Sequence, residues 1–212
     1  MQTNITFSEF KTRAVGLGGE LGRHIARFDL RPWETSSDMP CLLRSADHDP
    51  ADPLPEGYGC YLIEGDLETK GPISLSHLNW EHGDGNMILI VTGNLSCDRL
   101  VTEWGSLIIV GGDLTVRELF FAAREDSATI VIGDAHVWTY IGHDIPLDVG
   151  GVASIDYGFG YAQPLNMPDP FSKAVHPRHS EAETLLKLGY GRDIDALDDL
   201  DEALYGDVPP FR

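Results

Sequence analysis

The residues of this chain that could do chemistry are its histidines, its carboxylates and one glycine-rich segment. His176 and His179, in "HPRH", have the i, i+3 spacing of a metal pair, but Pro177 between them disfavours a shared helix. The segment "GLGGELG", residues 16–22, lacks both the Lys-Ser/Thr pair and the clear preceding strand of a phosphate-binding loop. His136 could act as a general base, and 34 acidic residues always allow some glycosidase-type pair of carboxylates. None of these patterns is specific, so the sequence predicts a non-enzymatic protein without cofactor or metal. An enzyme with an unrecognised carboxylate or histidine site stays open as an alternative.

The charge balance limits the classes of partner. Fifteen basic residues against 34 acidic ones give a formal net charge of −19. Such a charge repels phosphate backbones and anionic lipid, so we expect neither a nucleic-acid nor a membrane partner. It attracts a basic protein, although acidity that only keeps the protein soluble is an equally simple explanation.

The cysteines and the hydropathy pattern bear on the cellular compartment. Cys41, Cys60 and Cys97 are odd in number and form no C-x-x-C pair, which favours buried free thiols. The longest apolar runs fall far short of the roughly twenty residues that span a bilayer, and "MQTNITFSEFKTR" has no secretory pattern. The sequence therefore predicts a cytoplasmic protein.

A repeat in the middle of the chain determines the expected fold. The segments "YLIEGDLET", "LIVTGNLSC", "LIIVGGDLTV" and "TIVIGDAHV" align on Gly65, Gly93, Gly112 and Gly133, at intervals of 28, 19 and 21 residues, with a degenerate fifth unit near Gly150. Glycine can adopt positive φ and Asp or Asn can bond nearby backbone, so the pair suits a sharp corner between strands. A coil of about 20 residues at roughly 3.3 Å each has room for three short strands and three corners.

The columns after each glycine alternate between apolar and polar, as a strand with one buried face requires. We expect the apolar set to point into the coil and the polar set to point out. The inward set is Leu67, Leu95, Cys97, Leu114, Val116 and Val137, and the outward set is Glu68, Ser96, Thr115 and His136. Shared register favours a solenoid over the alternative, an antiparallel sandwich with Gly-Asp turns.

The sequence divides into three parts around these coils. We expect an N-terminal mixed cap and linker over residues 1–57, a solenoid of about four to five coils over 58–160, and a C-terminal crossing with two acidic helices over 161–212. The long first interval places an inserted loop at 76–86. Its Trp80, Glu81, His82 and Asp84 are candidate partner contacts, although a solvated loop with Trp80 folded onto the core is an alternative.

The C-terminal part carries two helix signals. Ser180 and Glu183 form a capping box that starts a helix ending at Gly189. A second helix is expected over 193–205, with an apolar stripe on one side and four acids opposite. These acids are the remaining candidate partner contacts: Asp195, Asp198, Asp199 and Glu202. The same helix could simply pack on the last coil with its charged face in solvent.

The columns of "VTGNLSCDRLVTEWGSLIIVGGDLTV" and "IVIGDAHV" resemble the right-handed β-helix of the bactofilins, over about residues 58–155. The resemblance implies a mainly β fold, a short right-handed parallel β-helix, here with an N-terminal mixed cap and a C-terminal helical cap. Bactofilins polymerise through bare coil ends, whereas the flanking segments here predict a monomer or small closed oligomer.

Small, acidic proteins with such repeats are also similar to the immunity proteins encoded beside bacterial polymorphic toxins. That similarity implies a protein that binds and neutralises a cognate toxin domain, which the charge argument expects to be basic. A bactofilin-like structural scaffold is the alternative function.

Overall fold

The computed structural model describes residues 2–28, 30, 40–47, 49–55, 57–75, 87–102, 105–122, 127–142 and 145–188. Within these ranges no helix has the length and apolar character needed to cross a membrane.

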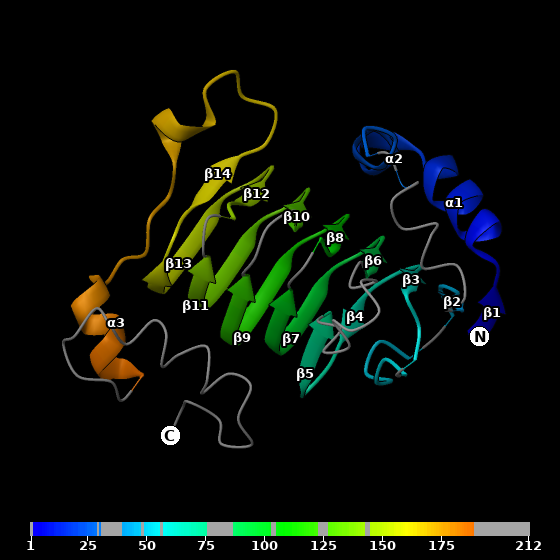
Figure 1. The fold of residues 1–212 in the computed structure, drawn as a ribbon, viewed down its shortest axis with the longest axis horizontal. Helices are drawn as coiled ribbons and strands as arrows, with labels where there is room; N and C mark the ends of the chain where they lie inside the picture. Colours follow the sequence, from blue (N-terminus) through cyan, green and yellow to red (C-terminus); the bar gives the residue numbers. More distant parts are fainter. Residues whose placement is uncertain are drawn as a thin grey trace.

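Parallel strands stack into a β-solenoid of about 5 turns, as the repeat predicts (Figure 1). Sheet A has eight strands in the order β1-β2-β3-β6-β8-β10-β12-β14, and all neighbours except β1 and β2 are parallel. Its strands are β1 (Gln2–Ile5), β2 (Cys41–Arg44), β3 (Cys60–Ile63), β6 (Ile88–Val91), β8 (Leu107–Val110), β10 (Ala128–Val131), β12 (Leu147–Val149) and β14 (Ala162–Pro164).

Sheet B is also parallel and contains the strands that follow each glycine corner. Its strands are β4 (Leu67–Glu68), β5 (Pro72–Leu75), β7 (Leu95–Thr102), β9 (Leu114–Ala122), β11 (Ala135–Gly142) and β13 (Ala153–Phe159). The register pairs Leu95 with Leu114 and Leu114 with Ala135, which is the alignment expected from the sequence.

Most coils contain two strands where the sequence suggested three. The second strand is long and changes direction within itself. Cys97 and Leu100 both belong to the interior cluster, as do Val137 and Tyr140, although a spacing of three would put them on opposite faces of a straight strand. In β9 the register shifts near Arg117, where one extra residue is accommodated. A bend inside a continuous strand therefore replaces the third corner.

The glycine corners are packed coil on coil. The Gly93 N–H donates to the Gly65 carbonyl at 2.9 Å, and the same contact recurs at Gly112, Gly133 and Gly151. A Cβ added to any of these four later glycines would lie 2.1–2.3 Å from the Asp or Asn side chain of the preceding coil. Positive φ, the expected reason for glycine, occurs in this column only at Gly65 (98°). Glycine is required at the others because the preceding coil lies so close.

The residue after each corner glycine forms a ladder between coils. Asp66 Oδ1 accepts from the Asn94 N–H at 2.7 Å, and Asn94 Oδ1 accepts from the Asp113 N–H at 2.8 Å. Asp113 and Asp134 continue the ladder to Val152. These side chains therefore tie neighbouring coils together, where the sequence suggested only a local turn.

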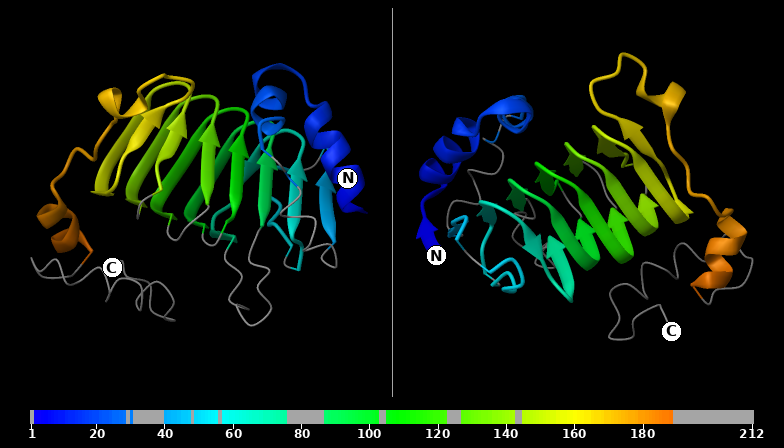
Figure 2. Two further views of the ribbon diagram at one scale, coloured as in Figure 1. Left: turned by 45° about the horizontal axis from the view of Figure 1, so that its top comes forward. Right: turned by 180° about the vertical axis from the view of Figure 1, so that it is seen from behind.

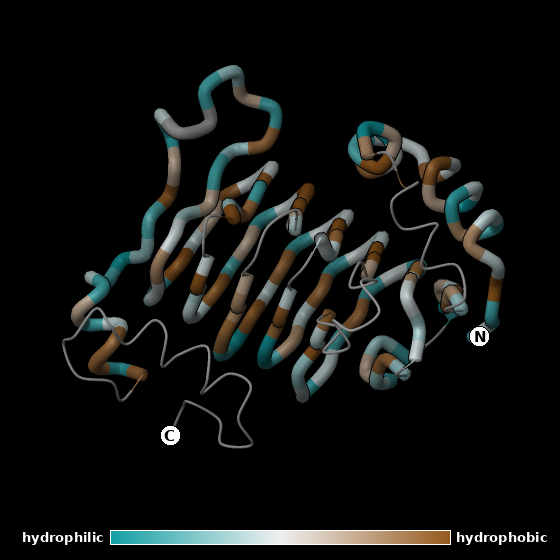
Figure 3. The backbone as a smooth tube through the Cα atoms, in the orientation of Figure 1, coloured by the Kyte–Doolittle hydropathy of each residue, from teal (hydrophilic) through white to brown (hydrophobic). Residues whose placement is uncertain are grey.

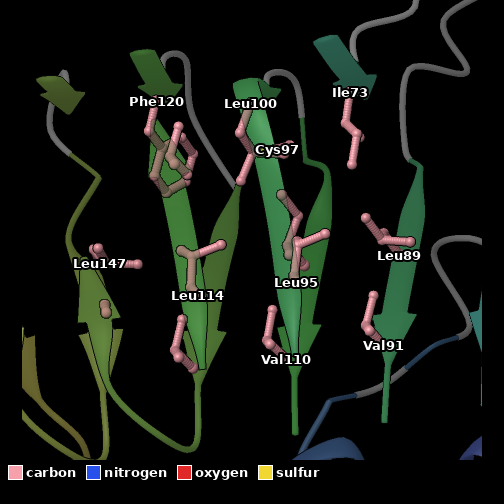
Figure 4. Close-up of a cluster of buried hydrophobic side chains, with 14 of the residues drawn as sticks. Ile73, Leu89, Val91, Leu95, Cys97, Leu100, Val110, Leu114, Phe120 and Leu147 are labelled. Atoms are coloured by element: carbon pink, nitrogen blue, oxygen red, sulfur yellow. The ribbon is translucent and has the colours of Figure 1, made fainter. Parts of the chain in front are cut away.

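The coil interior is the main hydrophobic core, and the inward set predicted from the sequence is buried in it. Figure 4 labels Leu95, Cys97 and Leu114 of this set among the interior side chains. Apolar and polar residues alternate along the sheet B strands (Figure 3). The three cysteines are free and buried, which confirms that expectation. The outer face of sheet A is also apolar over its N-terminal strands, where α1 (Phe7–Gly16) and α2 (Gly19–Ile25) pack on it. Figure 2 shows both helices beside the N-terminal half of the stack.

The N-terminal end of the stack is closed by other parts of the chain. Strand β1 pairs antiparallel with β2 and is the outermost strand of sheet A at this end, so the parallel stack does not continue past β2. On the sheet B side the Glu68 N–H of β4 donates to the Pro50 carbonyl at 2.7 Å. Buried Arg44 holds this loop, because its guanidinium donates to the carbonyls of Asp52 and Pro53, both at 2.7 Å. The stack therefore begins at β2, and the segment that follows it acts as a cover.

The C-terminal end is closed by one segment that runs along both sheets. Val175 and Ala162 of β14 exchange two backbone hydrogen bonds, of 2.7 and 2.9 Å. The Arg178 and His179 N–H groups then donate to the Ile155 and Asp156 carbonyls of β13, both at 3.0 Å. A 3-10 turn, η3 (Pro170–Lys173), precedes this segment and α3 (Glu181–Lys187) follows it, so the predicted helical cap is present.

Candidate functional site

The partner contacts predicted from the sequence lie outside the described residues. Trp80, Glu81, His82 and Asp84 fall in 76–86, and the acids of the expected second helix fall in 189–212. That second group is Asp195, Asp198, Asp199 and Glu202. Both groups stay predictions. Of the sequence candidates within the described ranges, His136, His176 and His179 can be placed.

The outer face of sheet B carries the polar columns expected to point out of the coils. Glu68 and His136 are exposed, and Ser96, Thr115 and Ser154 between and beside them are half-buried. A second outward column lies two residues further along each strand and is formed by Lys70, Asp98, Arg117, Trp138 and Asp156. These two columns run across five coils on the outer face of sheet B.

At the N-terminal side of this face, Arg117 ties three coils together. Its Nε lies 2.6 Å from Asp98 Oδ1, and its Nη1 donates to Ser96 Oγ at 2.6 Å. Its Nη2 donates to the Thr69 carbonyl, and Glu68 Oε1 lies 3.9 Å from Nη1. The Arg117 guanidinium is therefore bonded to other groups of the protein, and this part of the face stabilises the stack.

At the C-terminal side, Asp156 organises the charged groups. Its Oδ1 accepts from Arg178 Nη1 at 3.0 Å, and its Oδ2 lies 3.9 Å from His136 Nε2. Arg178 also donates from Nη2 to Ser154 Oγ at 2.7 Å. The Asp156 side chain is nearly buried, whereas that of Arg178 is 65% exposed, so the guanidinium remains accessible to a partner while its position is fixed.

Three rings gather next to these charges, and we call Trp138, Tyr157 and His179 the aromatic patch. Tyr157 stacks on His179 with centroids 4.1 Å apart and packs against Trp138 at 5.6 Å. The Lys187 ammonium lies 5.9 Å from the Tyr157 ring. Trp138 is 40% exposed, so a large apolar ring is held at the surface by its neighbours.

The C-terminal cap holds the patch in place. The Ser180–Glu183 capping box starts α3 as predicted, and Thr184 Oγ1 accepts from the Gly158 N–H at 2.9 Å. Gly158 has φ 138°, and a Cβ there would lie 1.7 Å from the Tyr140 carbonyl, so no other residue allows this approach. The helix is thereby fixed to β13, which sets the position of His179.

The histidines considered from the sequence have the following surroundings in the structure. Ser154, His136 and Asp156 are neighbours, but the Ser154 hydroxyl is bonded to Arg178 and no hydrogen bond joins it to His136. His176 packs near Tyr161 and His179 stacks on Tyr157, so each imidazole contacts a different tyrosine ring. Among the described residues no group of three or more His, Cys, Asp or Glu could hold a metal ion.

Sequence reasoning missed most of this surface. Trp138 and Asp156 occupy the same outward column as Arg117, and a tryptophan at an outward position was a usable signal. Arg178 and Tyr157 could not be found in this way, because their meeting depends on the path of the C-terminal crossing. Comparison with protein-family models, with curated proteins and with solved structures gives no match to this chain.

Proposed function

We propose that this chain is a non-catalytic binding protein of the immunity type, which binds and neutralises a cognate bacterial toxin domain in the cytoplasm. The observation that carries the proposal is the aromatic patch beside the exposed guanidinium of Arg178. Tryptophan, tyrosine and arginine are the residues most enriched where protein interfaces concentrate their binding energy.

The patch is suited to binding because it is already ordered. Trp138 packs on Tyr157, and Arg178 is held by Asp156 and Ser154, so little side-chain freedom would be lost on association. Paired charges around exposed rings match the usual composition of an interface, an apolar centre with a polar rim.

Charge supports a basic partner. The net charge of −19 would steer a cationic domain towards the protein, and the effect would fade beyond about 8 Å at physiological ionic strength. The acids at 195, 198, 199 and 202 and the loop at 76–86 remain proposed contributors to the same contact.

The closed ends favour this function over a bactofilin-like scaffold. A filament that grows coil on coil needs unpaired strands at both ends. Here β2 pairs with β1, β4 bonds to Pro50, and β13 and β14 bond to 175–179. These contacts support a monomer or a small closed oligomer.

Co-expression with the product of an adjacent toxin-like gene would test the proposal. We expect the intact chain to co-purify with that product and to restore growth of cells that express it. Trp138→Ala should weaken the co-purification and the restoration of growth. Val15→Ala, which trims an exposed apolar side chain on α1, should leave the co-purification and the growth unchanged. Charge reversal at Asp195, Asp198, Asp199 and Glu202 would show whether that segment takes part. Failure of the intact chain to restore growth would refute the immunity function, and filaments of the intact chain would favour the scaffold.

A further inference from the structure

The outer face of sheet A changes from apolar to polar along the stack. One outward column runs in register through every parallel strand and is apolar over its first five positions: Leu43, Leu62, Ile90, Ile109 and Ile130. The next two positions of the same column are Asp148 and Gln163. The apolar positions belong to the cluster that α1 and α2 pack against, so the change occurs where that cover ends.

A groove of about 410 Å³ lies over this change. One wall is the end of α2 and the turn after it, with His24, Arg27 and Phe28, and the other is the segment 163–167. Ile130 and Asp148 also line it. Arg27 Nη1 donates to Asn166 Oδ1 at 2.8 Å and so joins the two walls. The volume is within the range of small-molecule sites, about 300–1,000 Å³.

Two side chains of the groove, Asp148 and Gln163, present oxygen atoms that accept hydrogen bonds. Asp148 Oδ1 accepts from Gln163 Nε2 at 2.5 Å, and no ion pair joins Asp148 to a described residue. Gln163 Oε1 is buried and has no hydrogen-bond partner among the described residues. Burial raises the pKa of the Asp148 carboxyl, as is usual for a desolvated carboxylate without a cation.

The basic residues of the groove, Arg27 and His24, do not pair with the Asp148 carboxylate. Arg27 is directed to Asn166, and His24 Nε2 lies 3.5 Å from the Asn166 amide. Burial lowers the pKa of His24, which favours its neutral form. A partly buried carboxylate is stabilised by a paired cation, so the ligand group that suits Asp148 is a positively charged hydrogen-bond donor.

We propose that this groove binds a small organic amine whose ammonium group pairs with Asp148 and whose apolar part lies against Phe28 and Ile130. The net charge of −19 raises the local concentration of cations and disfavours anions. The site lies on sheet A, so it is separate from the aromatic patch on sheet B and independent of the proposed toxin binding.

Three probes of matched shape or charge test the assignment on the full chain: phenethylamine, 3-phenylpropanoate and methylammonium. In titrations followed by backbone amide NMR, we expect phenethylamine to bind and to shift the amides of Asp148, Gln163, Leu165, Asn166 and Met167. Methylammonium should bind more weakly because it lacks the apolar part, and 3-phenylpropanoate should not bind. Amide shifts at the Asp and Asn residues of the corner ladder, instead of at the groove, would overturn the proposal. Absence of phenethylamine binding would overturn it as well.

Two variants separate a specific ion pair from a general effect of the acidic surface. Asp148→Asn should weaken phenethylamine binding about tenfold or more. Asp169→Asn removes the same charge from an exposed position outside the groove and should change binding less than about twofold. Should Asp148→Asn fail to fold, Ile130→Phe, which fills the groove and keeps the charge, should abolish binding. Equal effects of the two Asp→Asn changes, or binding of 3-phenylpropanoate that Arg27→Gln removes, would overturn the assignment.

Discussion

Replacing the corner glycine of the third repeat, Gly112→Ala, should destabilise the protein. A Cβ at this position would lie 2.3 Å from Asn94 Oδ1 and 3.0 Å from the Gly93 carbonyl oxygen. Asn94 cannot simply turn away, because the same oxygen accepts from the Asp113 N–H at 2.8 Å. The added methyl group must therefore displace either the ladder side chain or the backbone of the neighbouring coil.

Three contributions set the size of the effect. A Gly→Ala change without strain stabilises by about 0.4–1 kcal/mol through the unfolded chain. Overpacking costs about 1–3 kcal/mol, and loss of the ladder hydrogen bond costs about 0.5–1.5 kcal/mol. The net change in unfolding free energy is then a loss of roughly 0.5–4 kcal/mol, and each kcal/mol lowers Tm by about 2–4 °C in a chain of this size.

Urea and thermal unfolding followed by circular dichroism measure this loss. Gly71→Ala is the matched control, since its Cβ would meet nothing nearer than Thr69 Oγ1 at 3.9 Å, and it should be neutral or slightly stabilising. In an Asn94→Ala background the cost of Gly112→Ala should fall by about 0.5 kcal/mol or more, because the blocking oxygen is gone. Unchanged stability of Gly112→Ala in the parent chain would refute the account of the corner.

Other predictions concern the core, the C-terminal closure and the buried thiol. Leu114→Ala leaves a cavity in the coil interior and should cost about 2–5 kcal/mol in chemical unfolding, while the outward neighbour change Thr115→Ala should stay within about 0.5 kcal/mol. Val175→Pro removes the N–H that bonds Ala162, so light scattering should detect self-association through the freed edge of β14, which Val175→Ala should not cause. Burial raises the pKa of Cys97 to about 12, so the native thiol should resist a thiol reagent at mildly alkaline pH. The unfolded thiol ionises first, so stability relative to Cys97→Val should decline from about pH 9 towards pH 12; a pH-independent difference would contradict the burial argument.

The repeat made the solenoid predictable, because a strand buried on one face alternates with period two and stacked coils share a register. The inward positions of Leu95, Leu114 and Val137 followed from the same rule and are confirmed. The role of the corner glycines was only partly predictable. A close approach between coils depends on atoms some 20 residues away, and a local turn rule does not include them.

The candidate surface was less predictable than the fold for the same reason. Trp138 could be placed on the outer face from its column, but its contact with Tyr157 and His179 arises where the C-terminal crossing returns along β13. Likewise, the sequence pattern marked the segment after β2 as a proline-rich linker, and only the structure shows that Arg44 holds it as a cover. Long-range closure of this kind leaves no periodic signal in the sequence.

Sedimentation velocity of the intact chain, over a wide range of protein concentration, tests most directly whether this solenoid is a discrete binding module. The closed ends predict one species of low mass, monomer or small closed oligomer, with a sedimentation coefficient that does not depend on concentration. A species whose mass keeps growing with concentration would contradict the closed ends, and with them the binding-module proposal, and would favour a polymer-forming scaffold.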